Sequence, residues 1–125
     1  MILNSVINQN ISKIKVLNII INSIIESNEL QFMNTLTQYE LFSTLLQYSI
    51  RQYSNYNGER YIIIKNKKVN NQLIFQFICP SNNKTTHIDD ETLKSSLEYI
   101  LVKQKFIINL EKIINSTYVV IILFI

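Results

Sequence analysis

The last nine residues of the chain, Thr117–Ile125, constrain its fold more than any other stretch. They carry no charge, and the nearest charged side chain before them is Lys112. Nearly all are β-branched or aromatic, which favours an extended strand. Apolar residues fall on both faces of that strand, so the pattern predicts a strand covered on both sides. The rest of the chain must supply that cover, because nine residues cannot cross a bilayer as a helix, which needs about 20.

The length of 125 residues predicts a single domain, residues 1–125, with enough chain to build one hydrophobic core. Hydrophobic residues make up 47% of the sequence and charged residues 17%, which is richer in core-forming residues than a disordered chain. Ile and Asn are abundant, whereas Ala and Trp are absent. Because Ile, Asn, Lys, Tyr and Phe have AT-rich codons, this composition indicates an AT-rich genome, such as that of an organelle or a virus.

Cysteine usage and hydropathy indicate the compartment. Cys79 is the single cysteine, so an internal disulfide is excluded and an intracellular reducing compartment, the cytoplasm or an organelle interior, is predicted. No run of 18 apolar residues is present, so no membrane-spanning helix is expected.

Local patterns predict the order of the elements. Apolar residues at helical spacing predict helices over residues 3–25 and 39–53, the second after a capping-box pattern that starts at Thr37. A short helical turn over about 30–36 precedes the second helix, or that helix is continuous from residue 29. Strands over 60–65 and 72–79 form a hairpin around a polar tip, 66–71, and a helix capped by Asp89 runs to about residue 103. Strands over 106–110 and 117–125 follow. We therefore predict an α+β domain with two N-terminal helices, a β-hairpin, one capped helix and two C-terminal strands in a mostly antiparallel sheet.

The single glycine, Gly58, excludes three common ways of holding nucleotide phosphates. A chain with one glycine cannot contain a Rossmann fingerprint, a P-loop or a kinase glycine loop. Other modes of phosphate binding stay open. We predict no cofactor.

A cluster around Cys79 and His87 is the strongest candidate for catalysis or metal binding. A Cys–His pair can form an activated thiolate, and His87, Asp89, Asp90 and Glu91 carry donor atoms that suit a divalent ion. Free cysteines are commonly small buried hydrophobes, and helix capping accounts for the three carboxylates without a metal. We therefore favour a structural role for the cluster and predict neither a catalytic residue nor a metal ligand here.

Basic residues near the predicted hairpin form a candidate nucleic-acid contact. The hairpin after two helices resembles a winged helix, and nearby tyrosines offer faces for stacking on bases. However, the second helix carries only Arg51, where a recognition helix normally brings several contacts, and lysines at a hairpin tip also deter edge pairing. The candidate contacts are Arg60, Lys65, Lys67 and Lys68.

Tyrosines crowd the middle of the chain and form a candidate partner surface, since tyrosine is enriched at protein interfaces. The candidates are Tyr48, Tyr53, Tyr56 and Tyr61. The sequence thus favours a small non-catalytic interaction or assembly module that binds another protein or itself. A nucleic-acid-binding protein that uses the basic hairpin tip is the alternative, and a small enzyme that uses Cys79 and His87 comes third.

Overall fold

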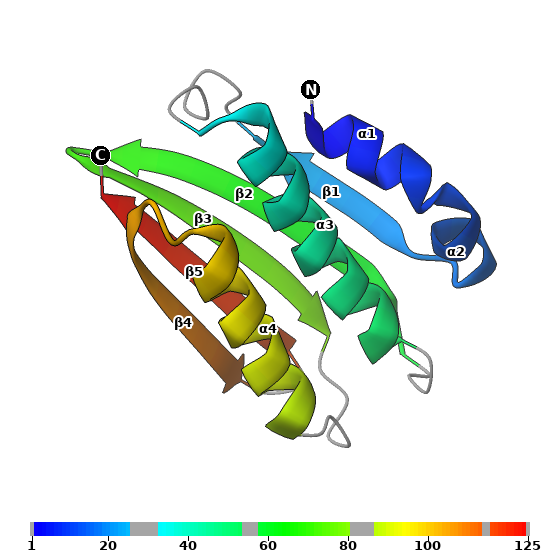
Figure 1. The fold of residues 1–125 in the computed structure, drawn as a ribbon. Coiled ribbons are helices and arrows are strands. Elements are labelled where there is room, and N and C mark those ends of the chain that lie inside the picture. The colour runs from blue at the N-terminus through cyan, green and yellow to red at the C-terminus, as the bar shows by residue number, and fades with distance from the viewer. Residues whose placement is uncertain (1, 26–32, 54–57, 81–86, 114–115, 125) are drawn as a thin grey trace.

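A five-stranded mixed sheet with helices packed on one face forms the architecture of the chain (Figure 1). The computed structural model describes residues 2–25, 33–53, 58–80, 87–113 and 116–124. Its elements are α1 (Ile2–Gln9), α2 (Ile11–Val16), β1 (Ile20–Ile24), α3 (Thr35–Gln52), β2 (Tyr61–Val69), β3 (Gln72–Pro80), α4 (His87–Ile100), β4 (Lys105–Ile113) and β5 (Ser116–Phe124). The predicted α+β class with a mostly antiparallel sheet is confirmed. Within the described ranges, no helix is long and apolar enough to cross a membrane.

The strand order across the sheet is β1-β2-β3-β5-β4. β1 pairs parallel with β2, and the other three pairings are antiparallel. The first hairpin turns through Asn70 and Asn71, and Asn70 has a φ of 56°, the left-handed conformation that two-residue hairpin turns require. Strand pairing continues to Val69 and Gln72. The predicted six-residue tip is therefore wrong, because most of it belongs to β2.

The predicted N-terminal helix over residues 3–25 is also wrong in its second half. α2 ends at Val16, and Asn18 has a φ of 54°, which asparagine tolerates better than most residues and which stops a helix. β1 follows and pairs with β2 from Ile20↔Tyr61 to Ile24↔Lys65. A run of isoleucines satisfies a helical spacing and a strand equally, and its β-branched side chains favour the strand.

The two longer helices begin earlier than the sequence predicts. Asn34 caps α3, because its side chain accepts a hydrogen bond from the Thr37 backbone N–H at 2.7 Å. α4 begins at His87 and ends at Ile100, so Asp89 lies in its first turn and is not the N-cap. α3 lies over the middle of the sheet, with α1 on one side and α4 on the other (Figure 1).

Burial along β5 corrects the expectation of a strand covered on both sides. Thr117, Val119, Ile121 and Leu123 are buried beneath the helices, whereas the residues between them are only half-buried. The hydrophobic core therefore lies between the helices and one face of the sheet. At its centre the rings of Phe42 on α3 and Phe75 on β3 meet edge to face, with 6.1 Å between centroids.

Candidate functional site

A groove between α3 and α4 is the first candidate site. The two helices run antiparallel over the sheet (Figure 1), and the groove between them has a volume of about 520 Å³. Tyr99 is 80% exposed at its rim. Tyr39 is held on the other side, because its hydroxyl donates a hydrogen bond to Gln9 Oε1 on α1. The residues that line the groove are Tyr39, Glu40, Ser43 and Thr44 of α3 and Ser95, Ser96, Tyr99 and Ile100 of α4.

The described walls of this groove offer mainly hydrogen-bonding groups and no cation. Four hydroxyl side chains and two tyrosine rings dominate its walls. Glu40 is the one charged residue among the described lining residues, which include no lysine or arginine. A flat ligand with an aromatic ring and several hydrogen-bonding groups suits such walls.

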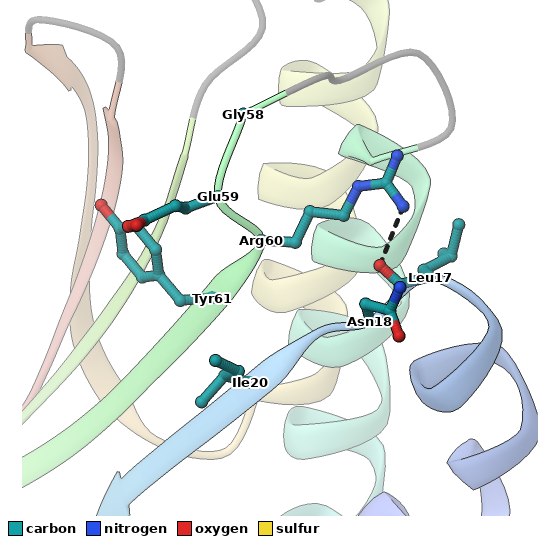
Figure 2. Close-up of a pocket in the computed structure, with 7 residues that line it drawn as sticks. All are labelled: Leu17, Asn18, Ile20, Gly58, Glu59, Arg60 and Tyr61. Carbon is teal, nitrogen blue, oxygen red and sulfur yellow. Dashed lines mark hydrogen bonds between the residues drawn. The ribbon is translucent and has the colours of Figure 1, made fainter.

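A second cavity of about 500 Å³ lies where β1 and β2 begin (Figure 2). Arg60 Nη1 donates a hydrogen bond to the Leu17 carbonyl oxygen at 2.8 Å, and the Ile20 N–H donates to the Arg60 carbonyl oxygen at 2.9 Å. Figure 2 shows the Arg60 side chain extending toward Leu17, while those of Glu59 and Tyr61 point the other way. Arg60 thus joins the end of α2 to the start of β2, which is a structural role.

The four predicted nucleic-acid contacts do not come together. Arg60 precedes β2, and Lys67 lies seven residues further on, which corresponds to roughly 20 Å along a strand. Lys65 and Lys67 lie on the face of the sheet away from the helices. Lys68 lies on the opposite face, since its partner in the register is the buried Leu73. The basic group is therefore divided between two faces and two ends of β2.

The predicted tyrosine surface is largely core. Tyr48 and Tyr53 are fully buried, and Tyr61 is half-buried. Tyr56 lies outside the described residues. The Tyr53 hydroxyl donates to the Tyr61 carbonyl oxygen. Because these side chains turn inward and use their hydroxyls inside the fold, Tyr48 and Tyr53 belong to the core rather than to a partner surface.

A polar chain beside β4, the edge strand opposite β1, was missed by sequence reasoning. The Tyr48 hydroxyl donates to Asp90 Oδ1 at 2.7 Å, and Asp90 Oδ2 lies 2.9 Å from Lys112 Nζ. These residues come from α3, α4 and β4, so no local pattern links them. In the sequence, Asp90 was explained by helix capping, and the separate helix-capping and strand patterns gave no signal for this contact.

Cys79 is not an activated nucleophile. Its side chain is fully buried on β3, and burial raises its pKa to about 11, although the nearby Ser49 hydroxyl and Lys112 ammonium lower it in part. The thiolate is the nucleophilic form, so this thiol is inert near neutral pH. The side chain of His87 lies outside the described residues. The hypothesis of a Cys79–His87 enzyme is therefore not supported.

Comparisons with known proteins identify the fold. No family model and no curated protein matches this sequence. Among solved structures, the histidine kinase AdeS of Acinetobacter baumannii has a TM-score of 0.76 at 11% identity, over 98% of this chain and 62% of the solved AdeS chain. The catalytic domain of the histidine kinase ThkA, in a nucleotide-free form, has a TM-score of 0.73 at 14% identity, over 98% of this chain and 90% of that domain. Full-length ShkA in complex with AMPPNP has a TM-score of 0.63 at 6% identity, over 98% of this chain and 29% of ShkA.

These likenesses show the fold of histidine kinase catalytic domains, and they correct the functional interpretation. A non-catalytic interaction module and a winged-helix-like nucleic-acid-binding protein were both wrong, since the sheet and helices match a catalytic-domain fold over nearly the whole chain. The organellar or viral source inferred from codon usage also finds no support in these matches and is not retained.

Proposed function

We propose that this chain is a nucleotide-binding domain and that the groove between α3 and α4 receives an adenine nucleotide. One observation carries the proposal. The groove lies between two helices of a fold that is similar to a catalytic domain described as nucleotide-free and to a kinase in complex with AMPPNP. AMPPNP is a ligand of ShkA and not of this chain. The chemistry of the groove supports the proposal that this chain binds a nucleotide as well.

The walls of the groove suit a base and a ribose. Tyr99 offers an exposed aromatic face at the rim, and stacking of a base on such a ring contributes about 1–3 kcal/mol. The hydroxyls of Ser43, Thr44 and Ser95 supply donors and acceptors for ring nitrogens and ribose oxygens.

In this proposal, the phosphate groups of the nucleotide contribute little to the binding affinity. The described lining offers no lysine or arginine, and Glu40 repels negative charge. With one glycine, the chain also lacks the common glycine-rich loops that hold phosphates. We therefore expect adenosine to bind about as tightly as ADP, and added salt to change the affinity little.

Isothermal titration of the full chain with adenosine, ADP and uridine tests the proposal. We expect both adenine ligands to bind and Tyr99→Ala to weaken them about tenfold, which corresponds to about 1.4 kcal/mol of lost stacking. Val16→Ala is the matched control, because Val16 on α2 is 81% exposed and lies outside the groove lining. If no adenine ligand binds, or if Tyr99→Ala binds as tightly as the wild type, the groove is not a nucleotide site.

A protein partner is part of the same proposal. ThkA has also been solved in complex with the response regulator protein TrrA, in a structure that resembles this chain with a TM-score of 0.69 at 13% identity, over 98% of this chain and 39% of ThkA. We propose that this chain, too, works with a protein partner. The reducing intracellular compartment stays a prediction.

A further inference from the structure

The face of the sheet opposite the helices is apolar along β5, while β3 beside it alternates Gln72 and Gln76 with isoleucines. The strand register places Ile74 and Ile78 of β3 beside Tyr118, Val120, Ile122 and Phe124 of β5 on this face. These side chains are half-buried by one another, and Ile107 on the neighbouring β4 is 46% exposed. Monomeric proteins seldom expose a contiguous apolar area of this kind unless it binds something.

Lysines flank this apolar stripe on both sides. Lys65 and Lys67 lie on β2, where they pair with Gln76 and Ile74. Lys105 lies on β4, and its Nζ is 5.9 Å from the centre of the Phe124 ring, which keeps the ammonium at the border of the stripe. Glu111 is the one acid among the described strand residues, and it lies on this face toward the other end of β4, so the face carries three lysines against one glutamate and its β2 flank is the more positive.

The spacing of the flanks matches the width of an α-helix. β3 and β5 lie between β2 and β4, so three strand spacings of about 4.8 Å place the strand that carries Lys65 and Lys67 about 14 Å from the strand that carries Lys105. A helix with its side chains is about 10–12 Å across. A helix that lies along β3 and β5 therefore has one flank beside Lys65 and Lys67 and the other beside Lys105.

We propose that this face, the lysine-flanked stripe, is a docking surface for an amphipathic α-helix of a partner protein that carries acidic residues on both sides of its apolar face. Charge complementarity selects this occupant over a second copy of the chain, which would bring further lysines to a positive surface. The described helices of the chain itself pack on the other face of the sheet (Figure 1). The proposal uses residues outside the α3–α4 groove and stands independently of nucleotide binding.

Two synthetic amphipathic helices of about 20 residues test the proposal. Both carry the same leucine stripe, and they differ only in the flanking positions, which are glutamate in one and lysine in the other. Fluorescence anisotropy with the full chain should show the glutamate-flanked helix binding at least about tenfold tighter at low salt. The double variant Lys65→Glu/Lys67→Glu should reverse this preference, and Ile107→Asp should weaken both helices.

Controls separate the proposal from folding defects and from simple charge attraction. The double variant Lys13→Glu/Lys15→Glu places the same charge change on α2 and should bind like the wild type, with circular dichroism confirming that each variant is folded. Equal binding of the two helices, or displacement of the acidic helix by heparin as readily as by an unlabelled copy, would overturn the proposal. Sedimentation that shows a dimer made monomeric by Ile107→Asp would assign the face to a second copy instead.

Discussion

At the scale of single residues, Cys79 links stability to pH. Burial raises its pKa from 9.0 to about 11, so the unfolded chain releases the thiol proton at lower pH than the folded chain. This contribution to stability is complete below about pH 9 and is lost as the pH rises to about 11, with a total of about 2–3 kcal/mol. Urea unfolding should therefore show a steeper alkaline loss of stability for the wild type than for Cys79→Ala. Parallel pH profiles would mean that the thiol does not titrate differently in the two states.

Asp89 and Asp90 are neighbours at the start of α4, and the contacts of Asp90 change the order of importance that the sequence predicts. A cap at Asp89 would make Asp89→Ala the costlier change. In the structure, Asp90 accepts the Tyr48 hydroxyl and pairs with Lys112, whereas Asp89 lies inside the first turn of α4. We expect Asp90→Ala to cost about 1.5–3 kcal/mol, because it removes the hydrogen bond from the Tyr48 hydroxyl to a charged group and the ion pair with Lys112. Thermal unfolding of both variants measures the difference, and a greater loss for Asp89→Ala would restore the original assignment.

At the scale of elements, β5 offers a matched pair of substitutions. Ile121 is fully buried beneath the helices, and Val120 faces the other side of the sheet. Ile121→Asp should unfold the chain, because it places an unpaired charge in the core. Val120→Asp should leave a folded protein, since the carboxylate can reach water. Circular dichroism on the two variants decides the point, and loss of structure in both would show that the open face is covered.

Most elements could be predicted from local patterns, but two features of the elements could not. A uniformly apolar strand such as β5 carries no alternation to reveal which face is open, because half-buried isoleucines and valines look the same in sequence as buried ones. The isoleucine run that forms β1 fits a helical spacing as well as a strand, and the turn at Asn18 is a property of a single backbone position. The observed helix starts differ from the predicted ones by a few residues, because several residues near each start can serve as caps.

At the scale of the whole molecule, composition and element order predicted the α+β class, whereas the candidate sites depend on long-range packing. The α3–α4 groove joins Thr44 to Ser95, and the polar chain joins Tyr48 to Lys112. The residues of each pair are so far apart in the sequence that no local pattern predicts their contact. Tyrosines and lysines were chosen from the sequence by residue type, but the fold places some in the core and others on the surface. Tyr48, for example, is in the core, and Lys67 is on the open face of the sheet. Residue type alone therefore identifies chemistry, but the sheet register decides which groups meet.

The parallel pairing of β1 with β2 has a consequence for how the molecule assembles. The β2–β3 hairpin closes through the two-residue turn at Asn70 and Asn71, whereas α3 lies between Ile20 and Tyr61 in the sequence. Closing that longer loop costs more chain entropy, and its single ladder to β2 is the only sheet contact that β1 gains among the described strands. The β2–β3 and β4–β5 pairings are therefore the local ones, whereas both the β3–β5 and the β1–β2 pairings must close long loops. We expect native-state fluctuations to release β1 first, because it is the shortest of the described strands and lies at an edge of the sheet.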